Sequence, residues 1–157
     1  MTPAEMAGLW LEAFLPDHLA AVAALEAEIA PAPWSVGMLA EELTLEGWRK
    51  VLLTPERTVV GYAVARLIYD EWHLLILGVA PKFWRRGLGR ALVADLLGEA
   101  RARTGGTVLL EVRASNVPAR RLYESLGFTC IGVRRGYYRH GPCGPEDALV
   151  MACCDAR

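Results

Sequence analysis

The sequence predicts one α/β domain over residues 1–157, built on a single mixed, mostly antiparallel sheet with one parallel pair and flanked by helices. Its length of 157 residues is close to the roughly 150 residues of a typical domain. The 54% hydrophobic and 22% charged residues indicate a globular protein with a sizeable core. Apolar residues alternate in several short segments and recur at helical spacing in others, which predicts both strands and helices.

The N-terminal third predicts a strand and two helices. Side chains alternate over residues 8–15, which indicates a strand. Asp17 is a suitable N-cap for a helix over residues 18–29, in which apolar side chains recur every three to four positions. After two prolines, Ser35 can cap a second short helix that reaches Leu43.

Three apolar segments separated by turn-like sequences then predict an antiparallel meander. These strands are Trp48–Leu53, Val59–Ile68 and Trp72–Val79.

A strand–helix–strand unit follows from the third of these segments. A loop over Pro81–Gly89 leads into a long helix that ends near Arg103, before two glycines. The next strand, Thr107–Val112, is apolar at nearly every position, which predicts burial on both faces. The unit therefore predicts a parallel strand pair with a right-handed crossover.

The C-terminal part predicts a helix and two final strands. The helix has proline in its first turn and glycine after its end, and covers Pro118–Leu126. The strands, Cys130–Tyr138 and Ala148–Cys153, flank a loop rich in glycine and proline.

Composition argues against several classes of protein. No run of about 18 apolar residues is present, so no membrane span is expected. The first residues lack the pattern of a secretory signal, which predicts a cytoplasmic protein. All four cysteines lie in the last 28 residues without a metal-ligand spacing. Reduced thiols and no metal site are therefore expected, with a disulfide or zinc as the alternative.

Charge is distributed unevenly along the chain. Residues 1–80 hold 4 basic and 11 acidic side chains, whereas residues 81–157 hold 13 basic and 7 acidic ones. The basic half suits a polyanionic ligand such as a phosphorylated cofactor, and the acidic half suits a cationic partner. Nucleic acid is not expected as a partner, because no basic stripe with interleaved aromatic residues is present.

One candidate ligand site is the glycine loop between a strand and a helix. Gly87 and Gly89 allow a backbone to approach a ligand, and the start of the helix offers unpaired N–H groups. Arginines add forked phosphate donors. The sequence predicts anion binding here, with a plain helix cap as the alternative. The loop consists of Arg85, Arg86, Gly87, Leu88, Gly89 and Arg90.

Three further residues could carry chemistry. Glu111 interrupts an apolar strand, where a charge is costly unless it is paired or lies at a cleft. An ion pair with an arginine and a functional role are equally consistent with this position. Tyr123, on the next helix, could be a core residue or a catalyst, and Asn116 has the position of a turn or cap residue.

These segments resemble the GNAT superfamily of N-acetyltransferases, and within it the RimI-type ribosomal-protein-alanine N-acetyltransferases. The resemblance extends over nearly the whole chain beyond residue 8, and the early Pro33-Trp34-Ser35 shares it. The segments that carry it are Arg85–Leu92, Leu110–Asn116, Arg121–Phe128, Arg134–Tyr138 and Glu146–Met151.

The resemblance implies a single N-acetyltransferase domain with the GNAT fold, the parallel pair at the cofactor cleft, and acetyl-CoA as acetyl donor without a metal. It implies Glu111 as general base and Tyr123 as general acid. The implied cofactor contacts are Leu77, Gly78 and Val79 for the pantetheine and acetyl group, Arg85, Arg86, Gly87, Leu88, Gly89 and Arg90 for the pyrophosphate, and Asn116. Trp84 and Ile76 depart from residues that are usual in the superfamily and in the subgroup, respectively.

The implied acceptor is the N-terminal amine of a protein, an alanine of a small-subunit ribosomal protein. The cost of deprotonation agrees with this acceptor. Removing the proton from an α-ammonium group at pH 7 costs about 1 kcal/mol, whereas removing it from a lysine ammonium costs about 4–5 kcal/mol. Trp34, Tyr137 and Tyr138 are expected to wall the acceptor groove, although each could belong to the core. The alternatives are an enzyme that acetylates lysine or a small amine, and a non-catalytic acetyl-CoA-binding module. Neither a membrane nor a particular oligomeric state is predicted.

Overall fold

One sheet organises the part of the chain that the computed structural model describes, residues 8–141 and 143–153. Its strand order is β1-β2-β3-β4-β5-β7-β6, and every neighbouring pair is antiparallel except β4–β5. This arrangement confirms the predicted fold class. The strands are β1 (Trp10–Ala13), β2 (Gly47–Leu53), β3 (Val59–Ile68), β4 (Glu71–Val79), β5 (Thr107–Arg113), β6 (Thr129–Gly141) and β7 (Gly144–Cys153).

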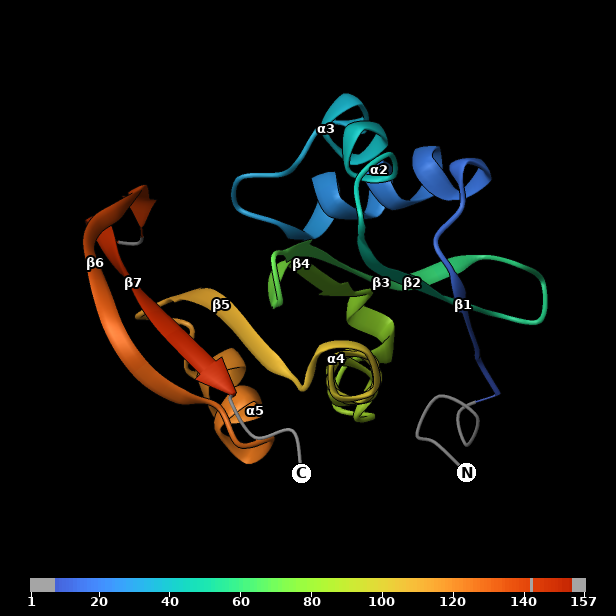
Figure 1. Cartoon of the computed structure of the whole chain (residues 1–157). Coiled ribbons are helices and arrows are strands. Elements are labelled where there is room, and N and C mark those ends of the chain that lie inside the picture. The colour runs from blue at the N-terminus through green and yellow to red at the C-terminus, as the bar shows by residue number, and fades with distance from the viewer. Residues whose placement is uncertain (1–7, 142, 154–157) are drawn as a thin grey trace.

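Helices cover both faces of the sheet, with α2 and α3 on one side and α4 and α5 on the other (Figure 1). Each side has its own apolar core. Trp72, Leu92 and Phe128 belong to the core beneath α4, and Val22 and Leu39 to the core beneath α2 and α3. None of the described helices is long and apolar enough to cross a membrane. The helices are α2 (Leu19–Ile29), α3 (Val36–Glu42), α4 (Leu88–Thr104) and α5 (Val117–Ser125), with 3-10 turns at Pro16–His18 and Pro81–Phe83.

The predicted caps are confirmed with one exception. The Ser35 hydroxyl accepts a hydrogen bond from the Met38 amide at the start of α3, and Gly105 ends α4 in the left-handed conformation. The prediction that Asp17 caps the first helix is wrong. Asp17 lies inside a 3-10 turn after Pro16, and the turn is closed by the Leu15 amide donating to Nδ1 of His18. Helix α2 therefore begins at Leu19, one residue later than predicted.

The predicted loop between the last two strands is wrong for most of its length. Strand β7 begins at Gly144, and the ladder continues through the Tyr138–Glu146 and Gly141–Gly144 pairs. Glycine allows this close crossing, because a Cβ on Gly141 would lie 2.6 Å from the carbonyl oxygen of Gly144. The result is a long hairpin that extends beyond the rest of the sheet (Figure 1).

The parallel pair β4–β5 is incomplete. It holds from the Glu71–Thr107 pair to the Leu74–Leu110 pair and then stops. Beyond this point β4 continues to pair with β3, while β5 continues with β7. Leu75 has no register partner on β3, so β4 contains a bulge where the strands part. The divergence leaves facing edges of two central strands open to a ligand.

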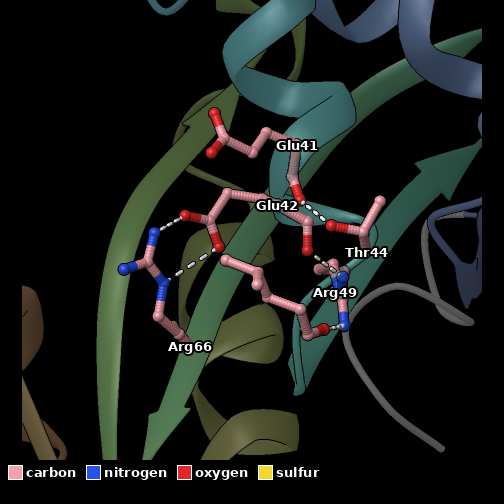
Figure 2. A network of polar contacts seen from close by, with 6 residues as sticks. Glu41, Glu42, Thr44, Arg49 and Arg66 are labelled. Atoms are coloured by element: carbon pink, nitrogen blue, oxygen red, sulfur yellow. Dashed lines mark hydrogen bonds and ion pairs between the residues drawn. The ribbon is translucent and has the colours of Figure 1, made fainter.

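A polar network fastens α3 to the sheet (Figure 2). Glu42 is only 5% exposed, and its carboxylate accepts hydrogen bonds from the Arg66 guanidinium on β3. Arg49 of β2 donates to the backbone carbonyls of Glu42 and Leu45 at the end of α3. These contacts satisfy carbonyls that a helix C-terminus leaves without internal partners.

Removing the Glu42 side chain tests this network. Glu42→Ala should lower the free energy of unfolding by about 1–3 kcal/mol, because it leaves the Arg66 guanidinium without its acceptor. Denaturant titration gives the value. The neighbouring Glu41→Ala is the matched control and should change the free energy by less than about 0.5 kcal/mol, since Glu41 is exposed. Equal losses in both variants would contradict the assigned role of the ion pair.

Candidate active site

A cleft of about 370 Å³ opens where β4 and β5 diverge. We call it the strand cleft. It is lined by four consecutive residues of each strand, one side of α5, and residues of the α2–α3 region: Leu74, Leu75, Ile76, Leu77, Leu110, Glu111, Val112, Arg113, Asn116, Ala119, Leu122, Tyr123, Glu26, Ala30, Pro31, Ala32, Trp34 and Tyr138.

A second hollow of about 490 Å³ adjoins it toward the β6–β7 hairpin. This hairpin hollow adds Tyr137 and Arg134 from the hairpin and shares six lining residues with the strand cleft: Trp34, Leu74, Leu75, Leu110, Glu111 and Tyr138. The two spaces therefore meet along these residues, and Glu111 is the carboxylate among them. The remaining lining residues are Glu71, His73, Leu109 and Val150.

The prediction that β5 is buried on both faces is wrong. One face of the strand is only half-buried, and Glu111 lies on that face. Val108, Leu110 and Val112 are buried, while the alternate residues are half-buried. The half-buried face lines the cleft. One carboxylate oxygen of Glu111 lies 3.6 Å from Nη1 of Arg134, so the ion pair and the cleft position occur together.

The other oxygen of Glu111, Oε2, is buried and has no hydrogen-bond partner in the part of the chain that the structure describes. A buried carboxylate oxygen without a donor is energetically costly. Because this oxygen is itself covered, a ligand N–H group or a water molecule would reach it only after the Glu111 side chain turns toward the cleft, which the 28% exposure of that side chain permits.

Tyr123 lies on α5 and faces the same strand cleft. It is 7% exposed, and its ring packs against Phe128 with the ring centres 5.6 Å apart. Burial, and to a smaller extent the neighbouring Tyr138, raises the pKa of the Tyr123 hydroxyl above its ordinary value. The side chain is thus both a core residue and a protonated group at the cleft.

The glycine loop stands at the start of α4. Gly87 has a φ of 75° and precedes the first helical residue, and no side chain caps the helix. Arg85 also has a positive φ, of 62°, so the loop turns sharply before the helix. A Cβ on Gly89 would lie 3.4 Å from Leu122 of α5, which lines the strand cleft. The helix start is thus adjacent to the cleft.

Two of the loop arginines contact other parts of the protein. Arg86 stacks over the Phe83 ring at 5.0 Å, and Arg90 donates to the Ser125 hydroxyl at the end of α5. Leu88 is buried against the core, so it contributes packing and its backbone rather than an exposed side chain.

The three residues predicted on the β4 edge have different positions. Leu77 lines the strand cleft, whereas Gly78 and Val79 lie further along β4 and do not line either described cavity. The Val79 carbonyl accepts a hydrogen bond of 2.6 Å from the Trp84 indole. Trp84, which departs from the superfamily pattern, thus ties the glycine loop to the end of β4.

Asn116 combines two roles. Its side-chain oxygen accepts a hydrogen bond from the Ala119 amide and so caps α5. It also lines the strand cleft, beside Tyr123 of the same helix.

The predicted acceptor residues Trp34, Tyr137 and Tyr138 all line the hairpin hollow. Arg134 stacks on the Tyr137 ring at 5.2 Å and Arg113 on the Tyr138 ring at 4.2 Å, which holds both rings on the hairpin. Tyr138 also has a raised pKa, chiefly from burial and then from the Glu111 charge.

Sequence reasoning missed several polar residues of the cavities. Glu26 lines the strand cleft, Arg134 pairs with Glu111, and Glu71 and His73 lie 3.9 Å apart in the hairpin hollow. Only Glu26 left a signal, as a charge on the apolar face of the predicted first helix. The others depend on pairing between distant segments.

The three cysteines that the structure describes do not line these cavities. Cys130 and Cys143 are exposed free thiols and Cys153 is a buried one, while Cys154 lies outside the described residues. Over residues 8–141 and 143–153, no group of three or more His, Cys, Asp or Glu side chains could hold a metal ion.

Buried tyrosines should shape the behaviour of the protein in alkali. The pKa values of Tyr62, Tyr123 and Tyr138 are all raised, so these hydroxyls stay protonated in the folded state above the unfolded value of about 10. Their contribution to stability is complete below about pH 10 and is lost as the pH rises toward the folded values. Tyrosinate absorbance should therefore be the same in Tyr123→Phe as in the parent up to about pH 10.5; a smaller rise in the variant would refute the raised pKa.

Comparison with known proteins places these features in a family. The model of the Acetyltransferase (GNAT) family matches residues 19–128, a span that includes the glycine loop, Glu111 and Tyr123. The [Ribosomal protein bS18]-alanine N-acetyltransferase of Salmonella typhimurium is 43% identical over 107 residues, which are 68% of this chain and 72% of that protein. The N-alpha-acetyltransferase RimI of Mycobacterium tuberculosis is 39% identical over 123 residues, 74% and 76% of the two chains.

A solved structure agrees with the sequence matches. The crystal structure of the ribosomal-protein-S18-alanine N-acetyltransferase from Escherichia coli superposes with a TM-score of 0.86 at 34% identity, over 92% of each chain. The match extends over the split between β4 and β5 as well as both helical layers, since it includes nearly the whole described fold. From the family match, the sequence identity and the common fold, the chain belongs to the Acetyltransferase (GNAT) family.

Proposed function

We propose that this protein transfers an acetyl group from acetyl-CoA to the N-terminal amine of a protein, the N-terminal alanine of a small-subunit ribosomal protein. The observation that carries the proposal is the unpartnered Oε2 of Glu111 at the junction of the two cavities. An acceptor amine entering from the hairpin hollow would meet this oxygen at the strand cleft. The ribosomal-protein S18-alanine acetylation for which the Salmonella and Escherichia coli relatives are named supports the same acceptor.

The GNAT family uses acetyl-CoA, which supplies an activated acetyl thioester. The residues of this chain fit such a ligand in two ways. Beyond Leu74 and Leu110, β4 and β5 no longer pair with each other. Backbone N–H and C=O groups near Leu77 are therefore available to hydrogen-bond an extended ligand. The uncapped start of α4 supplies N–H groups and a partial positive charge suited to a pyrophosphate.

The residues proposed to hold the cofactor follow from this fit. The β4 edge would hold the pantetheine arm, the α4 start the pyrophosphate, and the α5 cap a polar contact. They are Leu77, Gly78 and Val79; Arg85, Arg86, Gly87, Leu88, Gly89 and Arg90; and Asn116.

Two protein groups would move protons. Glu111 Oε2 would accept the proton of the acceptor ammonium, directly or through one water. The Tyr123 hydroxyl, whose pKa is raised by burial, stays protonated at neutral pH and would donate its proton to the departing thiolate. The cavity walls add a large share of the rate by holding the amine beside the thioester.

The acceptor would lie in the hairpin hollow. Trp34, Tyr137 and Tyr138 line it together with residues of β4 and β5. The outer part of this hollow carries Glu71, whose carboxylate lies 3.9 Å from His73. An acidic group at this position favours a cationic acceptor segment.

Two peptides test the acceptor. An alanine-initiated peptide with a free α-amine should be acetylated at least about tenfold faster than its α-blocked twin that contains a lysine, under saturating acetyl-CoA. The reason is that an α-amine loses its proton more readily by about 2.5 pKa units. Mass spectrometry locates the added acetyl group. Equal rates for both peptides would refute N-terminal specificity, and uptake by lysine alone would identify a lysine acetyltransferase.

Two variants test the assigned proton transfers. Glu111→Gln and Tyr123→Phe should each lower turnover by about a hundred- to ten-thousand-fold, while acetyl-CoA affinity stays within about twofold. Thiol release gives the rate and calorimetry the affinity. Glu124→Gln and Tyr69→Phe are matched controls at exposed positions and should keep the parental rate. Turnover within about twofold of the parent in either test variant would remove that residue from the mechanism.

A further inference from the structure

Glu26 is a buried carboxylate that the proposed reaction does not use. It lies on α2, is 3% exposed and lines the strand cleft. With Glu42, it is one of two buried charged side chains in the described part of the chain. Glu42 pairs with an arginine, whereas Glu26 accepts hydrogen bonds from two neutral donors.

The two oxygens of Glu26 connect two separate elements. Oε2 accepts a hydrogen bond of 3.0 Å from the backbone amide of Trp34, and Oε1 accepts one from the Tyr62 hydroxyl on β3. Trp34 follows two prolines and precedes α3, so its amide has no helical partner at this point of the chain. The carboxylate thus fixes the segment that forms one wall of the hairpin hollow.

Tyr62 extends the connection to the strand of the proposed cofactor site. A Cβ on Gly78 of β4 would collide with the Tyr62 hydroxyl and ring, and would also approach Ile29 of α2. Glycine at position 78 therefore leaves the space that Tyr62 occupies when it reaches Glu26. Burial and the bond to Glu26 raise the pKa of Tyr62, so its hydroxyl remains a donor at all ordinary pH values.

We infer that Glu26 is a positioning residue for the acceptor: through Tyr62 and the Trp34 amide it holds the acceptor wall at a fixed distance from strand β4. The inference rests on the proposed function, because it assigns Trp34 to the acceptor side of that reaction. Glu26 does not need to touch the reacting atoms for this role. Its effect is to place the peptide amine within reach of Glu111.

Glutamine is the discriminating substitution at this position. It has nearly the shape of glutamate, but its amide has one oxygen acceptor and one NH₂ donor. With its oxygen toward the Trp34 amide, its NH₂ group faces Tyr62, whose hydroxyl must then turn from donor to acceptor, and both hydrogen bonds lose the negative charge that strengthens them. Glu26→Gln should therefore raise the KM for an alanine-initiated peptide about tenfold, equivalent to about 1.4 kcal/mol, with kcat and the KM for acetyl-CoA within about threefold.

Two further variants separate positioning from general destabilisation. Glu42→Gln alters the other buried carboxylate and should lower the Tm while leaving the peptide KM unchanged. Tyr62→Phe keeps the ring in the space beside Gly78 but removes one donor to Glu26, and should raise the peptide KM by a smaller factor than Glu26→Gln. A rise in peptide KM as large in Glu42→Gln as in Glu26→Gln would overturn the inference.

A measurement without turnover completes the test. The hydrogen-exchange rate of the Trp34 amide, followed by NMR, should be slow in the parent and at least about tenfold faster in Glu26→Gln, with Glu42→Gln like the parent. Unchanged exchange or an unchanged peptide KM in Glu26→Gln would refute the role of Glu26. If the parent acetylates no peptide, the proposed function fails, and the exchange rates alone then decide whether Glu26 holds the Trp34 segment.

Discussion

The candidate active site of this protein depends on the point at which two parallel strands stop pairing. Parallel strands in a sheet normally satisfy each other's backbone groups along their length. Here β4 and β5 separate after Leu74 and Leu110, at a bulge in β4, and each remains paired only on its outer side. The open edges and the strand cleft follow from this separation.

The two buried faces of the sheet contribute differently to the site. The α4 and α5 side brings a helix start and the cap of a second helix to the cleft, joined by the close contact of Gly89 with Leu122. The α2 and α3 side brings the Trp34 segment, and the β6–β7 hairpin supplies the opposite aromatic wall. Cofactor and acceptor would therefore approach Glu111 from different layers of the molecule.

Three carboxylates, on α2, α3 and β5, differ in their hydrogen-bond and ion-pair partners. Glu42 is paired with Arg66 and fixes a helix. Glu26 has neutral donors on both oxygens and connects two segments. Glu111 has an arginine on one side and no partner on the other, which leaves a buried acceptor at the cavity junction. A buried acceptor without a donor is the arrangement that a substrate hydrogen bond can complete.

The sequence alone determined the elements, the fold class and the family of this protein. Apolar periodicity, prolines and glycines act locally, so they predicted the α-helices and the central parts of the described strands, and the segments around Gly87, Glu111 and Tyr123 carried the resemblance. Tertiary structure decided what depends on contacts between distant segments. The continued β6–β7 ladder, the Arg134 partner of Glu111 and the bonds from Trp34 and Tyr62 to Glu26 join residues that are far apart in sequence. Such contacts leave no local pattern, because chain folding alone brings the partners together.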